Sequence, residues 1–243
     1  MAAEKRSRLP LIAGVVVVLV AVAVGGFFYF TRDTSDPPLA LSDKPADSDG
    51  TSGDGGAVDT AELDGPWSVA AGSGDEATVA GYRVEEVFAS GSRRVTANGR
   101  TSDVTGTLTV ADGSVTEGEF TVDLTTLASD ESRRDNAIKD RGLQTAEFPD
   151  GTFTLTEAVE LPDVTDGETF TVAATGDLTL HGVTNPVTID LEGRAAGDIF
   201  TVQGSAPVVM ADYDIEPPSI GGFVEVEDEG SFEFLVHFEK AST

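Results

Sequence analysis

Two histidines and many carboxylates are the side chains that could support catalysis or bind a metal, because the chain has no cysteine. His181 directly precedes Gly182 in an expected turn, where a ring nitrogen commonly satisfies backbone groups. His237 lies between Glu233 and Glu239 on the side of a strand that alternation predicts to face solvent. The sequence has neither the Gly-x-Ser-x-Gly motif of serine hydrolases nor the His-Glu-x-x-His motif of zinc proteases. These features predict a protein that is not an enzyme and that has no cofactor and no metal site.

Acidic residues outnumber basic ones by 43 to 15, which gives a formal net charge of −28. A field of that sign repels phosphate backbones, so we predict no nucleic-acid partner. The cluster of Glu225, Glu227, Asp228 and Glu229 has little diagnostic value in so acidic a chain. Solubility is the simplest explanation of the acidity, and calcium binding by acidic loops is the alternative.

Basic side chains gather in one short segment, which holds Arg133, Arg134, Lys139 and Arg141. A guanidinium group offers a planar set of donors that fits phosphate and other oxygen acceptors. The segment also carries acids at helical spacing, so Asp130 could pair with Arg134. The segment therefore either presents a positive patch to a ligand or forms an ordinary charged helix surface.

The same segment is the one helix that we predict in the C-terminal part of the chain. Ser129 can cap its start, acids follow in the first turn, Lys139 and Arg141 fall in the last turn, and Gly142 is a stop signal. On both sides of it, apolar and polar residues alternate between Gly or Asp-Gly breaks, which predicts antiparallel strands with one buried face. This order of elements fits a closed barrel with one inserted helix, or a β-sandwich.

Phenylalanines recur on the predicted buried faces of these strands. The chain has 13 of them, against three tyrosines and one tryptophan. The candidates for the interior are Phe120, Phe153, Phe170, Phe200, Phe232 and Phe234. Each could simply fill a core, but as a set inside one barrel they could instead line a long apolar cavity.

The N-terminal region predicts a membrane anchor. Residues 9–30 form an apolar run without a charge, which is long enough to cross a bilayer core of about 30 Å as a helix. Lys5, Arg6 and Arg8 precede this run, so residues 1–8 are predicted to stay in the cytoplasm, with the domain outside the plasma membrane. The alternative is a signal peptide that is cleaved.

The next region, residues 31–63, is rich in Asp, Ser, Gly, Pro and Thr and has few large apolar residues. Such a composition buries too little apolar surface to fold, so it predicts a flexible acidic linker. The folded domain is then expected to cover residues 64–243.

This domain resembles the YceI-like family of exported polyisoprenoid-binding proteins. The segments that carry the resemblance are GPWSV at 65–69, VTGTL at 104–108, SRRD at 132–135, EFPDGTF at 147–153, GDLTLHGVTNPV at 176–187 and DYDI at 212–215. The resemblance implies an antiparallel, lipocalin-like β-barrel that holds a long isoprenoid-type lipid, polyprenyl or quinone-like, in its interior. The six phenylalanines are then the implied lipid contacts, and Arg133, Arg134 and Arg141 are the head-group candidates.

The expected function is that of a membrane-anchored, extracytoplasmic binding protein for such a lipid. The alternative is an exported β-sandwich module with an adhesive or structural role in the cell envelope and no lipid ligand. The sequence makes no prediction about the oligomeric state.

Overall fold

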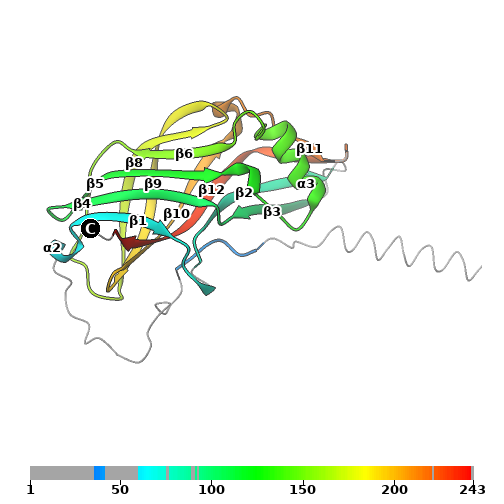
Figure 1. Cartoon of the computed structure of the whole chain (residues 1–243). Coiled ribbons are helices and arrows are strands. Elements are labelled where there is room, and N and C mark those ends of the chain that lie inside the picture. The colour runs from blue at the N-terminus through cyan, green and yellow to red at the C-terminus, as the bar shows by residue number, and fades with distance from the viewer. Residues whose placement is uncertain are drawn as a thin grey trace, which may run out of the picture. The chain divides into compact units, whose positions relative to one another are not determined.

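The strands of the domain form one antiparallel sheet that closes on itself (Figure 1). The structure is a computed structural model, and it describes residues 36–41, 60–74, 77–88, 91, 93–220 and 222–241. The strands are β1 (Gly65–Ala70), β2 (Val79–Phe88), β3 (Arg94–Thr101), β4 (Val104–Ala111), β5 (Ser114–Asp123), β6 (Asp150–Leu155), β7 (Val159–Glu160), β8 (Thr169–Leu180), β9 (Val183–Ala196), β10 (Ile199–Val209), β11 (Ser219–Ile220) and β12 (Val224–Lys240). The short helices are α2 (Thr60–Leu63), η2 (Leu124–Thr126), α3 (Ser132–Ala137), η3 (Ile138–Gly142) and η4 (Met210–Tyr213).

Strand β1 closes the barrel, because it pairs with β4 on one side and with β12 on the other. The ring therefore runs β1-β4-β5-β6-β8-β9-β10-β12 and returns to β1. This closed ring confirms the predicted antiparallel barrel, and it is not the β-sandwich of the alternative.

The long strand β12 has two neighbours on the same edge. Its last residues pair with β1, whereas residues 224–235 pair with β2, which continues into β3. A register shift between Val226 and Gly230 bends β12 where the β2–β3 hairpin joins it. The hairpin thus extends the barrel wall toward α3, and Figure 1 shows α2 and α3 at opposite ends of the barrel.

Tight turns join several neighbouring strands, as the Asp-Gly and Gly breaks predict. Asp112 and Gly113 connect β4 to β5 with φ angles of 51° and 75°. His181 and Gly182 do the same between β8 and β9, with φ angles of 51° and 75°. Two successive residues in the left-handed conformation give the turn a twist that matches the twist of the flanking strands. Gly adopts this conformation without a steric cost.

The helix lies where the sequence places it, but it is capped differently. Glu131, not Ser129, is the N-cap, and its carboxylate accepts a hydrogen bond from the Arg133 amide at 3.1 Å. The Ser129 hydroxyl instead donates to Asp135 Oδ1 at 2.6 Å. The helix continues as the π-helix η3 and ends at Gly142, the predicted stop.

The outer face of β12 is buried from Glu233 to His237, which corrects the prediction that His237 is solvated. Glu233, Leu235 and His237 are 3%, 1% and 4% exposed. The backbone amide of His237 donates to Thr78 Oγ1 at 3.0 Å, so the segment before β2 covers this end of the outer face. Alternation identified the inward residues correctly, but it could not show that chain segments cover the other face.

Two parts of the predicted linker lie against the barrel. One is α2, and the other is the segment 36–41, which crosses the outer face of β2 and β3. Arg83 Nη2 donates to the Asp36 carbonyl at 2.8 Å, and Arg100 Nη2 donates to the Pro37 carbonyl at 2.6 Å. Both guanidinium groups also bind Glu233, at 3.2 Å and 2.9 Å. The folded unit therefore includes residues 36–41, which composition alone assigns to the linker.

We expect Arg100→Ala to lower the free energy of unfolding by about 1.5–3 kcal/mol, because hydrogen bonds between charged, shielded groups are lost. The matched control is Arg94→Ala on the same strand, whose side chain is 60% exposed and pairs with Glu85 and Glu227. Arg94→Ala should lower the free energy of unfolding by less than about 1 kcal/mol. Urea unfolding followed by the emission of Trp67, the only tryptophan, measures both, and equal losses would contradict the prediction.

No helix in the described part of the chain is long and apolar enough to cross a membrane. The predicted anchor, residues 9–30, lies outside the described residues.

Candidate functional site

The barrel encloses an apolar cavity of about 120 Å³, which we call the main cavity. Every residue that lines it is aliphatic, aromatic or glycine. Its wall includes all six phenylalanines predicted from the sequence to face the interior: Phe120, Phe153, Phe170, Phe200, Phe232 and Phe234. No polar side chain offers a hydrogen bond there, so this space suits a hydrocarbon chain and not a polar substrate.

Glycines on neighbouring strands keep several of these rings against the barrel wall. Phe170 lies opposite Gly193, and Phe234 lies opposite Gly204. A Cβ atom on Gly193 would come within 2.7 Å of the Phe170 ring, and one on Gly204 within 2.6 Å of the Phe234 ring. Because glycine has no side chain, each ring can lie over the neighbouring strand, and this leaves space along the barrel axis.

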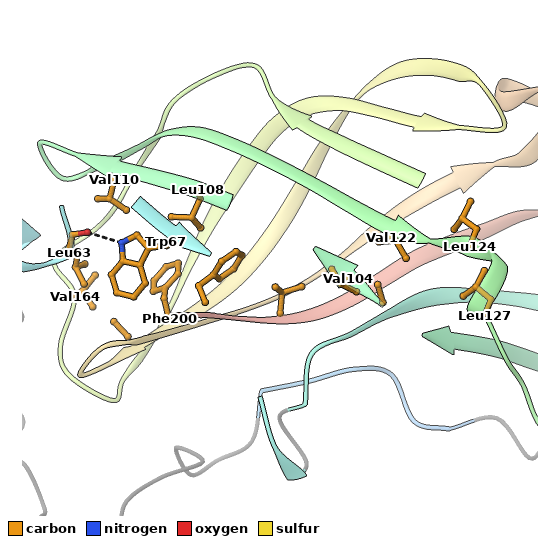
Figure 2. Packing of buried hydrophobic residues seen from close by; sticks show 14 residues of the cluster. Leu63, Trp67, Val104, Leu108, Val110, Val122, Leu124, Leu127, Val164 and Phe200 are labelled. Atoms are coloured by element: carbon orange, nitrogen blue, oxygen red, sulfur yellow. Dashed lines mark hydrogen bonds between the residues drawn. The ribbon is translucent and has the colours of Figure 1, made fainter. Parts of the chain in front are cut away.

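One end of the main cavity is closed by Trp67 and its neighbours. The Trp67 indole nitrogen donates to the Leu63 carbonyl of α2 at 2.9 Å, and the ring centroid lies 6.2 Å from that of Phe200. Figure 2 shows Leu63, Val164 and Val110 around this indole. All of them are buried, so this end of the barrel is plugged by side chains.

A second apolar cavity, of about 80 Å³, lies near the helix, and we call it the helix-proximal cavity. Ile138 and Leu143 line it from the helix side, and Tyr82 and Val84 line it from β2. Phe232 borders both cavities. The two spaces are therefore neighbours along the inner face, and together they outline an elongated apolar path.

Charged groups lie beyond the helix-proximal cavity, between α3 and β2. Arg134 forms a bidentate pair with Glu86, with one contact of 3.1 Å, and it also binds Asp130. Its side chain is 11% exposed and that of Glu86 is 5% exposed. Burial lowers the pKa of Arg134, but the hydrogen bonds and charge of Glu86 outweigh this effect and raise it above its usual value. Arg134 thus stays charged and holds α3 against β2.

The three arginines predicted as head-group ligands are not brought together. Protein acceptors occupy the guanidinium group of Arg134, as described above. Arg133 is exposed on α3, and Arg141 is exposed and donates from Nη2 to the Ser219 carbonyl at 2.7 Å. The predicted pairing of Asp130 with Arg134 is confirmed. These positions favour the charged helix surface over a shared positive patch.

Sequence reasoning missed Tyr82. Its hydroxyl is buried and has no hydrogen-bond partner among the described residues. Ser129 lies near enough to lower the pKa of this hydroxyl, but the two do not meet hydrogen-bond geometry, and Ser129 Oγ already donates to Asp135. Burial raises the pKa of Tyr82 well above its usual range, and the charges of Asp135 and Glu86 add to that shift. A single tyrosine in a strand has no motif that would reveal this environment.

The raised pKa of Tyr82 makes stability depend on pH above 10. The unfolded chain loses this proton near the usual value of 10.0, whereas the folded chain retains it. The free energy of unfolding should therefore fall as the pH rises past 10, by up to about 1.4 kcal/mol per pH unit. The Tyr82→Phe variant should lack this contribution to the pH dependence. Urea unfolding from pH 9 to 11 tests this, and a constant difference between the two proteins would contradict it.

Both histidine side chains contact groups of other segments of the barrel. His181 Nδ1 donates to the Tyr213 carbonyl at 3.2 Å, as its position in the turn predicts, and its ring lies 4.4 Å from that of Phe148. His237 Nδ1 lies 3.2 Å from Thr201 Oγ1. Within the described ranges, no group of three or more His, Cys, Asp or Glu side chains is arranged to hold a metal ion.

Comparisons with known proteins agree with this architecture. A polyisoprenoid binding domain from Saccharophagus degradans, implicated in plant cell wall breakdown, superposes with a TM-score of 0.56 at 18% identity, covering 72% of this chain and 98% of that one. At this identity the likeness shows the fold alone.

Two curated relatives are similar in sequence. A UPF0312 protein of Vibrio parahaemolyticus is 33% identical over 113 residues, and one of Vibrio campbellii is 32% identical over 117 residues. Each match covers 44% of this chain, and the chain spans just over half, 57%, of each relative.

The family comparison covers most of the domain. The model of the YceI-like domain matches residues 77–238, which extend from just before β2 into the end of β12. The matched residues include all but one strand of the closed ring, together with the helix and the whole lining of both cavities. With this match, the chain belongs to the YceI-like family.

Proposed function

We propose that this protein binds a long isoprenoid-type lipid inside its barrel. The observation that carries the proposal is the main cavity, whose lining has no polar side chain and continues toward the helix-proximal cavity. The polyisoprenoid binding domain with the same fold supports the choice of lipid. A cavity without polar groups binds and shields a chain but supplies no reacting group, so we propose binding and not catalysis.

We further propose that the protein is a single-pass protein of the plasma membrane, with a cytoplasmic N-terminus and an extracytoplasmic barrel. The support is the uncharged apolar run at residues 9–30 and the basic residues before it. Protease added to intact spheroplasts should release the domain. Protection of the domain until lysis would reverse this orientation.

The experiment for lipid binding is a chain-length series. Prenols of increasing length compete with a fluorescent prenyl probe for the full chain in mild detergent. Each buried methylene contributes about 0.8 kcal/mol, which is roughly a fourfold gain in affinity, until the path is full. Affinity should therefore rise steeply with length and then level off. An affinity that does not depend on chain length, or no displacement of the probe, would overturn the proposal.

A further inference from the structure

The register of β1 places Trp67 on the inner face of the barrel. Trp67 pairs with Leu108 on β4, which lines the main cavity, and paired residues of antiparallel strands project to the same side. The indole ring also packs against Phe200, another residue of the cavity wall, and Figure 2 shows the two rings side by side. Trp67 therefore stands directly behind the end wall of the main cavity.

The indole ring of Trp67 is fixed by polar contacts as well as by packing. Its nitrogen donates to the Leu63 carbonyl, and Lys240 Nζ lies 5.8 Å from the ring centroid. The residue is 2% exposed. A buried indole cannot swing away without leaving its donor unpaired, which is costly. Trp67 is thus a rigid barrier and not a side chain that an entering lipid easily displaces.

The surroundings become charged beyond Trp67. An open cleft beside it is lined by its neighbours on β1 and by the ends of β10 and β12. Four of the lining residues are charged: Asp64, Asp198, Glu239 and Lys240. A hydrocarbon chain that entered this cleft would displace water from charged groups and gain no apolar wall in return. The space that suits a lipid tail therefore ends at Trp67.

A lipid chain would meet this barrier with its apolar end. The main cavity has no polar side chain, and the indole donor of Trp67 is already bound to the Leu63 carbonyl. A head group at this end would be buried without a hydrogen-bond partner, whereas a terminal isoprenoid unit carries no such penalty.

We propose that Trp67 is the length-limiting residue of the lipid site. The tail of a bound chain stops against Phe200 and the Trp67 ring behind it, so the barrel fully buries isoprenoid chains only up to a fixed length. A longer chain leaves its excess outside the cavity and gains no further affinity. This inference rests on the proposed lipid-binding function and names the residue that sets the upper limit of chain length.

The test repeats the prenol series with Trp67→Leu, whose smaller side chain opens space at this end. Prenols too short to reach Trp67 should bind the two proteins equally. The affinity plateau should move to longer prenols in the variant, with a gain of about fourfold for each methylene that is newly buried. Leu235→Ala is the matched control, because Leu235 is 1% exposed and lines neither cavity, and its plateau should not move.

The outcomes distinguish this inference from the function on which it rests. A plateau at the same chain length in Trp67→Leu and in the unchanged protein would overturn the role of Trp67, while the plateau itself still supports a lipid site. Failure of the unchanged protein to bind any prenol would overturn the proposed function.

If Trp67→Leu does not fold, the emission of Trp67, the only tryptophan, decides in the unchanged protein. Bromine quenches indole emission only at short range. A prenol of plateau length with bromine at its tail should therefore quench Trp67, and one with bromine beside its hydroxyl should not. No quenching by the tail-brominated prenol, or equal quenching by both, would overturn the inference.

Discussion

We expect Arg134→Ala to lower the free energy of unfolding by about 3–5 kcal/mol. The substitution leaves the carboxylate of Glu86, which is 5% exposed, without its bidentate partner. Removing one member of a buried ion pair is costly because the remaining charge is neither solvated nor neutralised. Urea unfolding at neutral pH, followed by the emission of buried Trp67, measures the loss.

Two further variants make this prediction specific. Arg133→Ala, on the exposed side of the same helix, should change the free energy of unfolding by less than about 0.5 kcal/mol. Glu86→Leu combined with Arg134→Met should recover much of the loss, because an apolar pair of similar size avoids the unpaired charge. A small effect of Arg134→Ala, or equal effects of Arg133→Ala and Arg134→Ala, would show that the pair does not hold the helix.

The second large effect is expected from filling the main cavity. Ala174 on β8 is 4% exposed and lines this cavity. Ala174→Phe places a ring in the space that the lipid chain would occupy, so binding of a long prenol should weaken at least tenfold. Overpacking of this kind costs about 1–3 kcal/mol, which is less than the roughly 5–15 kcal/mol by which domains are typically stable, so we expect the variant to fold. A competition assay with a fluorescent prenyl probe measures the loss of binding.

Ala173 provides the matched control, because it neighbours Ala174 on the same strand but is exposed on the outer face. Ala173→Phe adds the same ring outside the barrel, and prenol binding should be unchanged. Equal binding by both variants would mean that the lipid does not occupy the main cavity.

The inward faces of the strands could be predicted because side chains alternate along a strand. Phe232, Phe234, Val236 and Phe238 all line the main cavity, as their spacing indicates. The helix was recognisable from its charges and from Gly142, although its cap differs by two residues. These features depend on local patterns, which can be recognised from the sequence alone.

The missed features depend on contacts between distant segments. Glu233 is buried because Arg83, Arg100 and the segment 36–41 cover it, and none of these lies near it in the sequence. The placement of Phe170 over Gly193 depends on strand register, which alternation does not give. The unpaired hydroxyl of Tyr82 likewise results from the fit of a helix against a hairpin.

Native mass spectrometry of the protein, extracted from its own cell envelope in mild detergent, shows directly whether the barrel holds a lipid. We predict a species with the mass of the chain plus one lipid, and fragmentation of that lipid into isoprenoid units. The Ala174→Phe variant should lack this species, and the Ala173→Phe variant should retain it. A lipid-free mass for the unchanged protein, both after extraction and after incubation with long prenols, would contradict lipid binding by this barrel.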